Sequence, residues 1–175
     1  PGFQAAVSEY YQSSEHLAIA GSQTAIQALP RCLKSLPVLL PLLGYQEHLK
    51  FWQRENSDTH FYPSLDKQSA VESIDTALNK NNQQHLVIIN PNNPTGLIFD
   101  ADQLRCWAQQ LAYDAYLIVD EAFMDLTPEQ SLLTQDLPHN VIVLRSFGKF
   151  FGLAGIRLGF IFANKPLLNK IENDR

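Results

Sequence analysis

Short apolar runs alternate with longer segments of helical periodicity along most of this 175-residue chain. The predicted strands are residues 16–20, 38–40, 85–89, 116–119, 141–144 and 158–162. The predicted helices are residues 3–11, 22–34, a short one from residue 45, 70–78, 104–112, and a last one that begins at Asn164 and Pro166. Strands that alternate with helices form a mostly parallel sheet with right-handed crossovers. We therefore predict an α/β fold in which helices flank a mostly parallel sheet around one core.

Local features refine this prediction. Pro30 is expected to bend or shorten the helix of residues 22–34, because proline lacks a backbone N–H. Asp100 with Gln103 forms a capping-box pattern at the start of a helix. Residues 54–66 are polar, and we expect them to be irregular.

Residues suited to ligand binding follow the predicted strands at equivalent places. They are Gly21, Tyr45, Asn93, Asp120 and Lys149. The carboxyl ends of strands in an open α/β sheet meet at one edge, and ligands bind there. We therefore expect these residues to form one site.

Residues 145–159 contain a hydroxyl, an amine and a guanidinium among glycines and apolar residues, at Ser146, Lys149 and Arg157. Ser and Arg can hold a phosphate, Arg with its fork of donors, and a lysine amine can condense with a carbonyl. This combination suits a phosphorylated aldehyde. A lysine and an arginine that merely flank a core loop are the alternative interpretation.

Other strand ends carry suitable groups as well. Gly21-Ser22-Gln23 leads into a helix whose first backbone N–H groups are unpaired and can bind an anion, although a plain tight turn is the alternative. Asp120 ends an apolar strand, where a carboxylate is costly to bury unless a cation meets it. The segment 90–96 has two prolines and a glycine, which indicate a rigid turn.

Two of these motifs resemble those of a known family. Ser146, Lys149 and Arg157 match the Ser-x-x-Lys…Arg motif of fold-type I pyridoxal-phosphate (PLP) enzymes, the aspartate aminotransferase superfamily. Asn-Asn-Pro-Thr-Gly at residues 92–96 is similar to a loop of the same family. The resemblance covers nearly the whole chain and implies the large PLP-binding domain of these enzymes, an α/β/α sandwich.

The resemblance also implies a role for each residue toward pyridoxal 5′-phosphate. Lys149 would bind the cofactor covalently, and Asp120 would protonate its pyridine nitrogen; these two residues would be catalytic. Tyr45 would stack on the pyridine ring, and Asn93 would bond the 3′ oxygen. The remaining cofactor-binding residues would hold the phosphate, and they are Gly21, Ser22, Gln23, Ser146 and Arg157. Glu121, beside Asp120, is expected to be structural.

Longer segments resemble one subgroup of the family. Residues 120–132 and 146–160 look like the L-threonine-O-3-phosphate decarboxylases of cobalamin (vitamin B12) biosynthesis, as do residues 20–27 and 44–48. Aminotransferases of the histidinol-phosphate type commonly have a tyrosine where this chain has Phe123, so a hydroxyl contact to the 3′ oxygen is lost here. The resemblance implies PLP-dependent decarboxylation of L-threonine O-3-phosphate to aminopropanol phosphate.

Two alternatives remain open. One is an aminotransferase that acts on histidinol phosphate or a similar amino acid. The other belongs to a different class, a non-catalytic PLP-binding module of a regulator. For both the decarboxylase and the aminotransferase, the expected substrate is a small molecule, an amino acid or an amino-acid phosphate.

The resemblance further implies that residues 1–175 are a fragment that lacks an N-terminal arm and a C-terminal small domain. That small domain would carry the arginine for the substrate carboxylate. The full-length protein is expected to be a homodimer.

Composition excludes several other classes. The net charge is −5 and no basic cluster is present, which argues against nucleic-acid and anionic-membrane binding. The longest apolar run, residues 36–43, is too short to span a bilayer. Cys32 and Cys106 are isolated and the five histidines are scattered, so no disulfide framework and no metal site are expected. The expected location is the cytoplasm.

Overall fold

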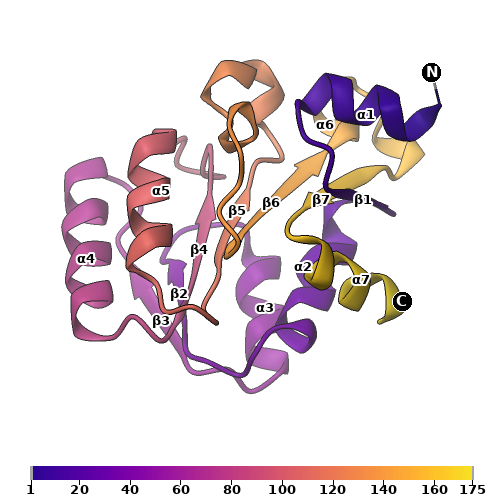
Figure 1. Cartoon of the computed structure of the whole chain (residues 1–175). Coiled ribbons are helices and arrows are strands. Elements are labelled where there is room, and N and C mark those ends of the chain that lie inside the picture. The colour runs from indigo at the N-terminus through magenta and orange to yellow at the C-terminus, as the bar shows by residue number, and fades with distance from the viewer. Residues whose placement is uncertain (1, 175) are drawn as a thin grey trace.

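The computed structural model describes residues 2–174, apart from the side chain of Ala154 (Figure 1). Its helices are α1 (Phe3–Tyr11), α2 (Ser22–Cys32), α3 (Gln46–Arg54), α4 (Lys67–Lys80), α5 (Ala101–Gln110), α6 (Phe147–Phe150) and α7 (Lys165–Asn173). Its strands are β1 (His16–Ile19), β2 (Val38–Pro41), β3 (Thr59–Tyr62), β4 (His85–Ile89), β5 (Leu117–Asp120), β6 (Val141–Ser146) and β7 (Gly159–Phe162). Short 3-10 helices are η1 (Met124–Leu126), η2 (Pro128–Gln130), η3 (Leu132–Thr134) and η4 (Ala154–Ile156).

The strands form a seven-stranded sheet in the order β1-β7-β6-β5-β4-β2-β3. Five neighbouring strands pair in parallel, in the order β3-β2-β4-β5-β6. Strand β7 is antiparallel to both of its neighbours, β6 and β1. Consequently β1 runs in the same direction as the parallel strands. Their carboxyl ends meet at one edge of the sheet, and β7 begins at that edge. The predicted mostly parallel sheet flanked by helices is confirmed.

Helices cover both faces of the sheet, because successive strand residues point to opposite faces and both sets are apolar. In β4, for example, Leu86 and Ile88 belong to one core cluster and Val87 belongs to the other. The first cluster includes side chains of α1, α4 and α5, and the second includes side chains of α2, α3 and α7. Figure 1 shows α4 and α5 side by side, away from α2 and α7.

Residues 54–66, predicted to be irregular, contain the strand β3, so that prediction was wrong for residues 59–62. β3 lies at the end of the sheet and pairs in parallel with β2. Phe61 is 42% exposed, while Tyr62 is buried and donates a hydrogen bond to the carbonyl of Val87 at 3.1 Å. An edge strand leaves much of its side-chain surface in water, so it lacks the apolar run by which the other strands were recognised.

Most helix predictions are confirmed. Asp100 accepts a hydrogen bond from the backbone N–H of Gln103 at 2.9 Å, as expected of a residue that caps α5. α2 contains Pro30 and ends at Cys32, which is consistent with the expected shortening. The short helix expected from residue 45 is α3, and Tyr45 is the residue just before it.

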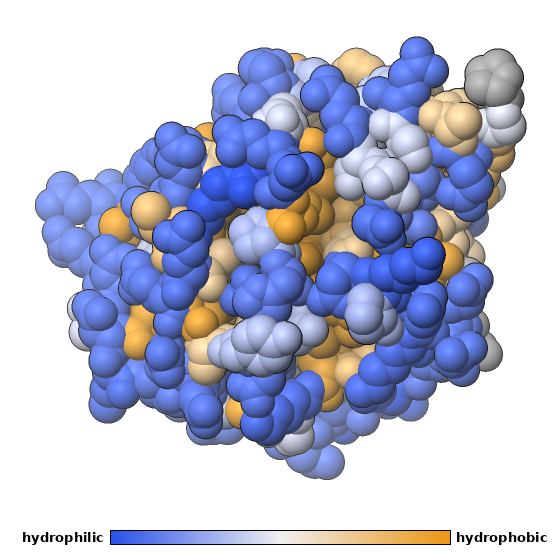
Figure 2. Space-filling view, in the orientation of Figure 1, coloured by the Kyte–Doolittle hydropathy of each residue, from blue (hydrophilic) through white to orange (hydrophobic). Residues whose placement is uncertain are grey.

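The surface is mostly polar, with apolar patches between the polar side chains in the view of Figure 2. Within residues 2–174, none of the helices combines the length and the apolar character that crossing a bilayer requires. Both cysteines are free.

Candidate active site

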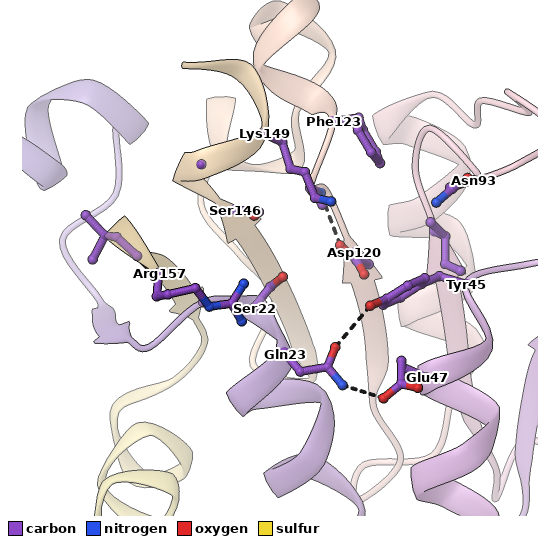
Figure 3. Close-up of a pocket in the computed structure, with 15 residues that line it drawn as sticks. Ser22, Gln23, Tyr45, Glu47, Asn93, Asp120, Phe123, Ser146, Lys149 and Arg157 are labelled. Carbon is purple, nitrogen blue, oxygen red and sulfur yellow. Dashed lines mark hydrogen bonds between the residues drawn. The ribbon is translucent and has the colours of Figure 1, made fainter. Parts of the chain in front are cut away.

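A cavity of about 340 Å³ lies at the edge of the sheet where the parallel strands end (Figure 3). All of the residues predicted to bind the cofactor line it, together with several that were not predicted. The lining residues are Gly21, Ser22, Gln23, Tyr45, Glu47, Ile89, Asn93, Asp120, Ala122, Phe123, Ser146, Gly148, Lys149, Arg157 and Leu158. They come from strand ends, helix starts and loops far apart in the sequence, and the parallel topology brings them together.

The turn after β1 is shaped by glycines. Gly21 has a φ of +80°, which glycine adopts without strain, and it places Ser22 at the start of α2. A Cβ atom on Gly159 would lie 2.6 Å from the backbone nitrogen of Ser22, which is too close for any side chain. Glycine at this position therefore lets β7 approach the first turn of α2.

Arg157 approaches the same turn from the other side. A Cβ atom on Gly21 would lie 3.2 Å from Nη2 of Arg157, so the guanidinium packs directly on the glycine backbone. Arg157 itself has a φ of +52°, a left-handed conformation that a residue with a side chain seldom adopts. Such backbone strain persists only where the surroundings impose it, here between η4 and β7.

Lys149 lies on the short helix α6, directly after β6, and its side chain points into the cavity toward Asp120 (Figure 3). Its amine is 5.5 Å from the centroid of the Phe123 ring, within the range of a cation–π contact. Among the described residues, neither Lys149 nor Arg157 forms a salt bridge with a carboxylate. Both cations are therefore available to an anionic or carbonyl ligand.

Asp120 is buried at the floor of the cavity and is only 3% exposed. Its Oδ1 accepts the backbone N–H of Ala122 at 3.1 Å, and its Oδ2 is 2.9 Å from Nε2 of His48. His48 is also buried, on α3. The five histidines are scattered along the sequence, so their distribution alone does not indicate this partner. The i, i+3 spacing of Tyr45 and His48 places both on one side of a helix, and it could have suggested a shared site.

Tyr45 lines the cavity, and the residue is 42% exposed. Its hydroxyl donates a hydrogen bond to Oε1 of Gln23 at 3.2 Å. Nε2 of Gln23 donates to Oε2 of Glu47 at 2.6 Å, and Lys50 donates to Oε1 of Glu47 at 3.2 Å. The side chain of Gln23 is therefore engaged with α3 and its neighbouring tyrosine, which leaves its backbone N–H for an anion.

The three asparagines of the loop after β4 have different surroundings. The Asn90 side chain donates to the carbonyl of Phe99 and accepts its N–H, both at 2.9 Å. Asn92 donates to the carbonyl of Leu43 at 2.8 Å and to the hydroxyl of Thr95 at 2.7 Å. These bonds attach the loop to neighbouring segments, and residues 93–95 form a turn. Asn93 is left exposed, with its side chain at the cavity.

Glu121 points away from the cavity, in line with its expected structural role. Its carboxylate forms a buried ion pair with Arg145 at 2.8 Å and accepts the backbone N–H of Leu132 at 2.9 Å. Arg145 also pairs with the buried carboxylate of Asp125. Burial raises the pKa of Glu121, and the nearby guanidinium opposes that rise. Burial alone would lower the pKa of Arg145, but its two carboxylate partners raise it overall.

The described residues offer no cluster of three or more His, Cys, Asp or Glu side chains that could hold a metal ion. The arrangement instead combines an amine, an anion-binding helix start with an arginine, a buried carboxylate and an aromatic ring around one cavity.

Comparison with known proteins places this chain in a family. The model of the class I and II aminotransferases matches residues 1–175. The threonine-phosphate decarboxylase of Pseudomonas aeruginosa is 41% identical over 173 residues, which cover 97% of this chain and 49% of that protein. The histidinol-phosphate aminotransferase of Chlorobium chlorochromatii is 38% identical over 107 residues, which cover 60% of this chain and 29% of that protein.

Solved structures show the same fold. The L-threonine-O-3-phosphate decarboxylase of Porphyromonas gingivalis superposes with a TM-score of 0.80 at 17% identity, over 97% of this chain and 54% of that one. The histidinol-phosphate aminotransferase of Sinorhizobium meliloti, solved in complex with pyridoxal 5′-phosphate, gives 0.82 at 23% identity, over 98% of this chain and 49% of that one.

The chain belongs to the class I and II aminotransferase family. It spans about half the length of the curated relatives with which it aligns almost end to end.

Proposed function

We propose that the cavity binds pyridoxal 5′-phosphate and that the full-length protein decarboxylates L-threonine O-3-phosphate. The observation that carries the proposal is that one cavity collects every residue that the family motif assigns to the cofactor. The 41% identity to a threonine-phosphate decarboxylase along almost the whole chain supports this reaction over transamination.

The residues fit the cofactor group by group. The first backbone N–H groups of α2, the Ser146 hydroxyl and the Arg157 guanidinium would hold the phosphate. Tyr45 would stack on the pyridine ring, and Asn93 would bond the 3′ oxygen. Lys149 would bind the cofactor covalently.

Asp120 would hold a proton at the pyridine nitrogen, and the contact with His48 keeps its carboxylate in place. When bound, the cofactor withdraws electrons from the substrate Cα, which is the chemistry that decarboxylation needs. Binding of the substrate amine would release Nζ of Lys149, and after CO2 leaves the free amine would deliver a proton to Cα. The ring of Phe123 lies beside that amine, with its centroid 5.5 Å from Nζ.

Cofactor attachment is tested directly. Borohydride reduction of the full-length protein loaded with pyridoxal 5′-phosphate, followed by peptide mapping, should find the label on Lys149. A label on Lys165, which lies at the start of α7, would contradict the assignment.

The reaction is tested by product analysis. The full-length protein incubated with L-threonine O-3-phosphate should release CO2 and form aminopropanol phosphate. Formation of a keto acid would favour the histidinol-phosphate type of aminotransferase. Cofactor binding without turnover of either kind of substrate would favour the regulator module.

Assembly belongs to the same proposal. We propose that the full-length protein is a homodimer in the cytoplasm. The dimer is supported by several large apolar side chains near the cavity that are exposed, because bare apolar surface favours association. They are Phe150, Phe151, Leu153 and Ile156. Light scattering of the full-length protein should give the mass of two chains, and the mass of one chain would refute the dimer.

A further inference from the structure

The mouth of the cavity is crossed by a chain of polar side chains that joins α2 to α3 (Figure 3). Gln23, in the first turn of α2, bonds Tyr45 through its amide oxygen and Glu47 through its amide nitrogen. Lys50, three residues after Glu47 on α3, bonds the same carboxylate. Gln23 thus joins Tyr45 to α2, the helix whose N-terminus faces the cavity.

Donor and acceptor chemistry determines which way the amide points. An ionised carboxylate can only accept hydrogen bonds, so Glu47 must face the amide nitrogen of Gln23. The amide oxygen is then left toward Tyr45, whose hydroxyl can donate to it. Because the bond to Glu47 is 2.6 Å long and involves a charge, it is the stronger of the two and sets the orientation.

Tyr45 needs such a tether. It precedes α3, and the residue is 42% exposed, so a large part of it has no packing partner. Its other ring contact is an edge-on approach to His48 with centroids 6.5 Å apart. A hydrogen bond at the hydroxyl, the far end of the side chain, restricts the swing of the ring more than a contact near the backbone does.

We propose that Gln23 is a positioning residue that holds the Tyr45 ring in the orientation that receives the cofactor. This inference rests on the proposed function and deepens it. Glu47 orients the Gln23 amide, and Gln23 in turn orients the tyrosine. The backbone N–H of Gln23 remains available to the phosphate, so the residue would serve the cofactor at two places through different groups.

The test is a double-mutant cycle in the full-length protein, with cofactor-free samples titrated with pyridoxal 5′-phosphate. Gln23→Met keeps the length of the side chain and removes the amide, while Tyr45→Phe keeps the ring and removes the hydroxyl. Each change should weaken cofactor binding about fivefold, the equivalent of one lost hydrogen bond. The double variant should be no weaker than either single one, because both remove the same interaction.

Visible circular dichroism of the bound cofactor supplies a readout of ring orientation besides affinity. Both single variants should reduce its amplitude to a similar extent. Gln68→Met is the matched control, because Gln68 also donates from its amide to a carboxylate, that of Glu72 at 2.9 Å, on the exposed side of α4. It should change neither affinity nor dichroism.

Additive losses in the double variant, about 25-fold together, would overturn the proposal, because Gln23 would then act independently of the tyrosine hydroxyl. An unchanged affinity in Gln23→Met would overturn it too. If that variant fails to fold, Gln23→Ala replaces it in the same cycle. A wild-type protein that binds no pyridoxal 5′-phosphate would refute the proposed function, whereas normal wild-type binding with an additive cycle would refute only this inference.

Discussion

Asp120 and Glu121 are adjacent, acidic and buried, yet they lie in opposite surroundings. Asp120 faces the cavity, and its side-chain partners are a histidine and one backbone N–H. Glu121 faces the other side of the sheet, where a guanidinium and a backbone N–H meet its carboxylate. Asp120 is the last residue of β5 and Glu121 directly follows it, so a shift of one residue along extended backbone separates a candidate catalytic group from a structural one.

The comparison shows what makes a buried carboxylate a site residue. Arginine is charged at every accessible pH, so the pair of Glu121 and Arg145 is a permanent part of the core. Asp120 lines the cavity instead, so its carboxylate has room for a further partner beside His48. Burial alone does not distinguish the two residues; their partners do.

The largest expected effect separates the two carboxylates by activity. Asp120→Asn keeps the shape of the side chain and removes its charge, so turnover of L-threonine O-3-phosphate by the full-length protein should fall about a thousandfold, within the range seen for proton-handling residues. Cofactor absorbance should remain, because the phosphate and Lys149 contacts are untouched. A kcat near that of the wild type would contradict a catalytic role for Asp120, and both carboxylates would then count as structural.

The second effect separates them by stability. Arg145→Met leaves the buried carboxylates of Glu121 and Asp125 without their cation, which should lower the free energy of unfolding by at least about 3 kcal/mol. Urea denaturation of the full-length protein measures it. Lys34→Met is a suitable control, because its pair with Asp114 is at the surface, and exposed pairs contribute less than about 1 kcal/mol. Equal losses in the two variants would mean that the buried cluster is not a structural element.

The third effect tests the partner of Asp120. His48→Phe retains an aromatic ring and removes the nitrogen 2.9 Å from the carboxylate, so kcat should fall about tenfold, in keeping with the loss of one hydrogen bond to a charged group. KM should change little, because His48 does not line the cavity. A fall in cofactor affinity with kcat intact would show that the histidine supports α3 rather than Asp120.

The smallest effect concerns Asp100, an exposed carboxylate that caps α5 and can be compared with the two buried ones. The backbone N–H of Gln103 lowers the pKa of Asp100, and Lys67 contributes to the shift. A lowered pKa stabilises the folded state above the ordinary value of 3.8, and this contribution is lost as the pH falls through the lowered pKa. Asp100→Ala should therefore cost about 1 kcal/mol at pH 7, measured by urea denaturation, and less at pH 2, where the protonated carboxyl is a weaker acceptor. A loss that is larger at pH 2 than at pH 7 would contradict the contribution of the ionised cap.

Much of the fold could be predicted from the sequence, because it depends on patterns between near neighbours. The apolar runs of the buried strands, the helical stripes and the cap at Asp100 are all contained within short segments. The same is true of the spacing of Ser146, Lys149 and Arg157. A parallel sheet then places the ends of its strands at one edge whatever the details of packing, so the composition of the site followed as well.

Only the tertiary structure decided which partners those residues have. His48 and Asp120 are 72 positions apart, and Gln23 and Tyr45 are 22 positions apart, so no local pattern relates them. The edge strand β3 could not be predicted from the sequence for a related reason. It is defined by its hydrogen bonds to β2 and not by an apolar run of its own. The sequence by itself determined which chemical groups reach the carboxyl edge of the sheet. Packing of distant segments decided how each group is oriented, because hydrogen bonds depend on distances that the chain sets only once it is folded.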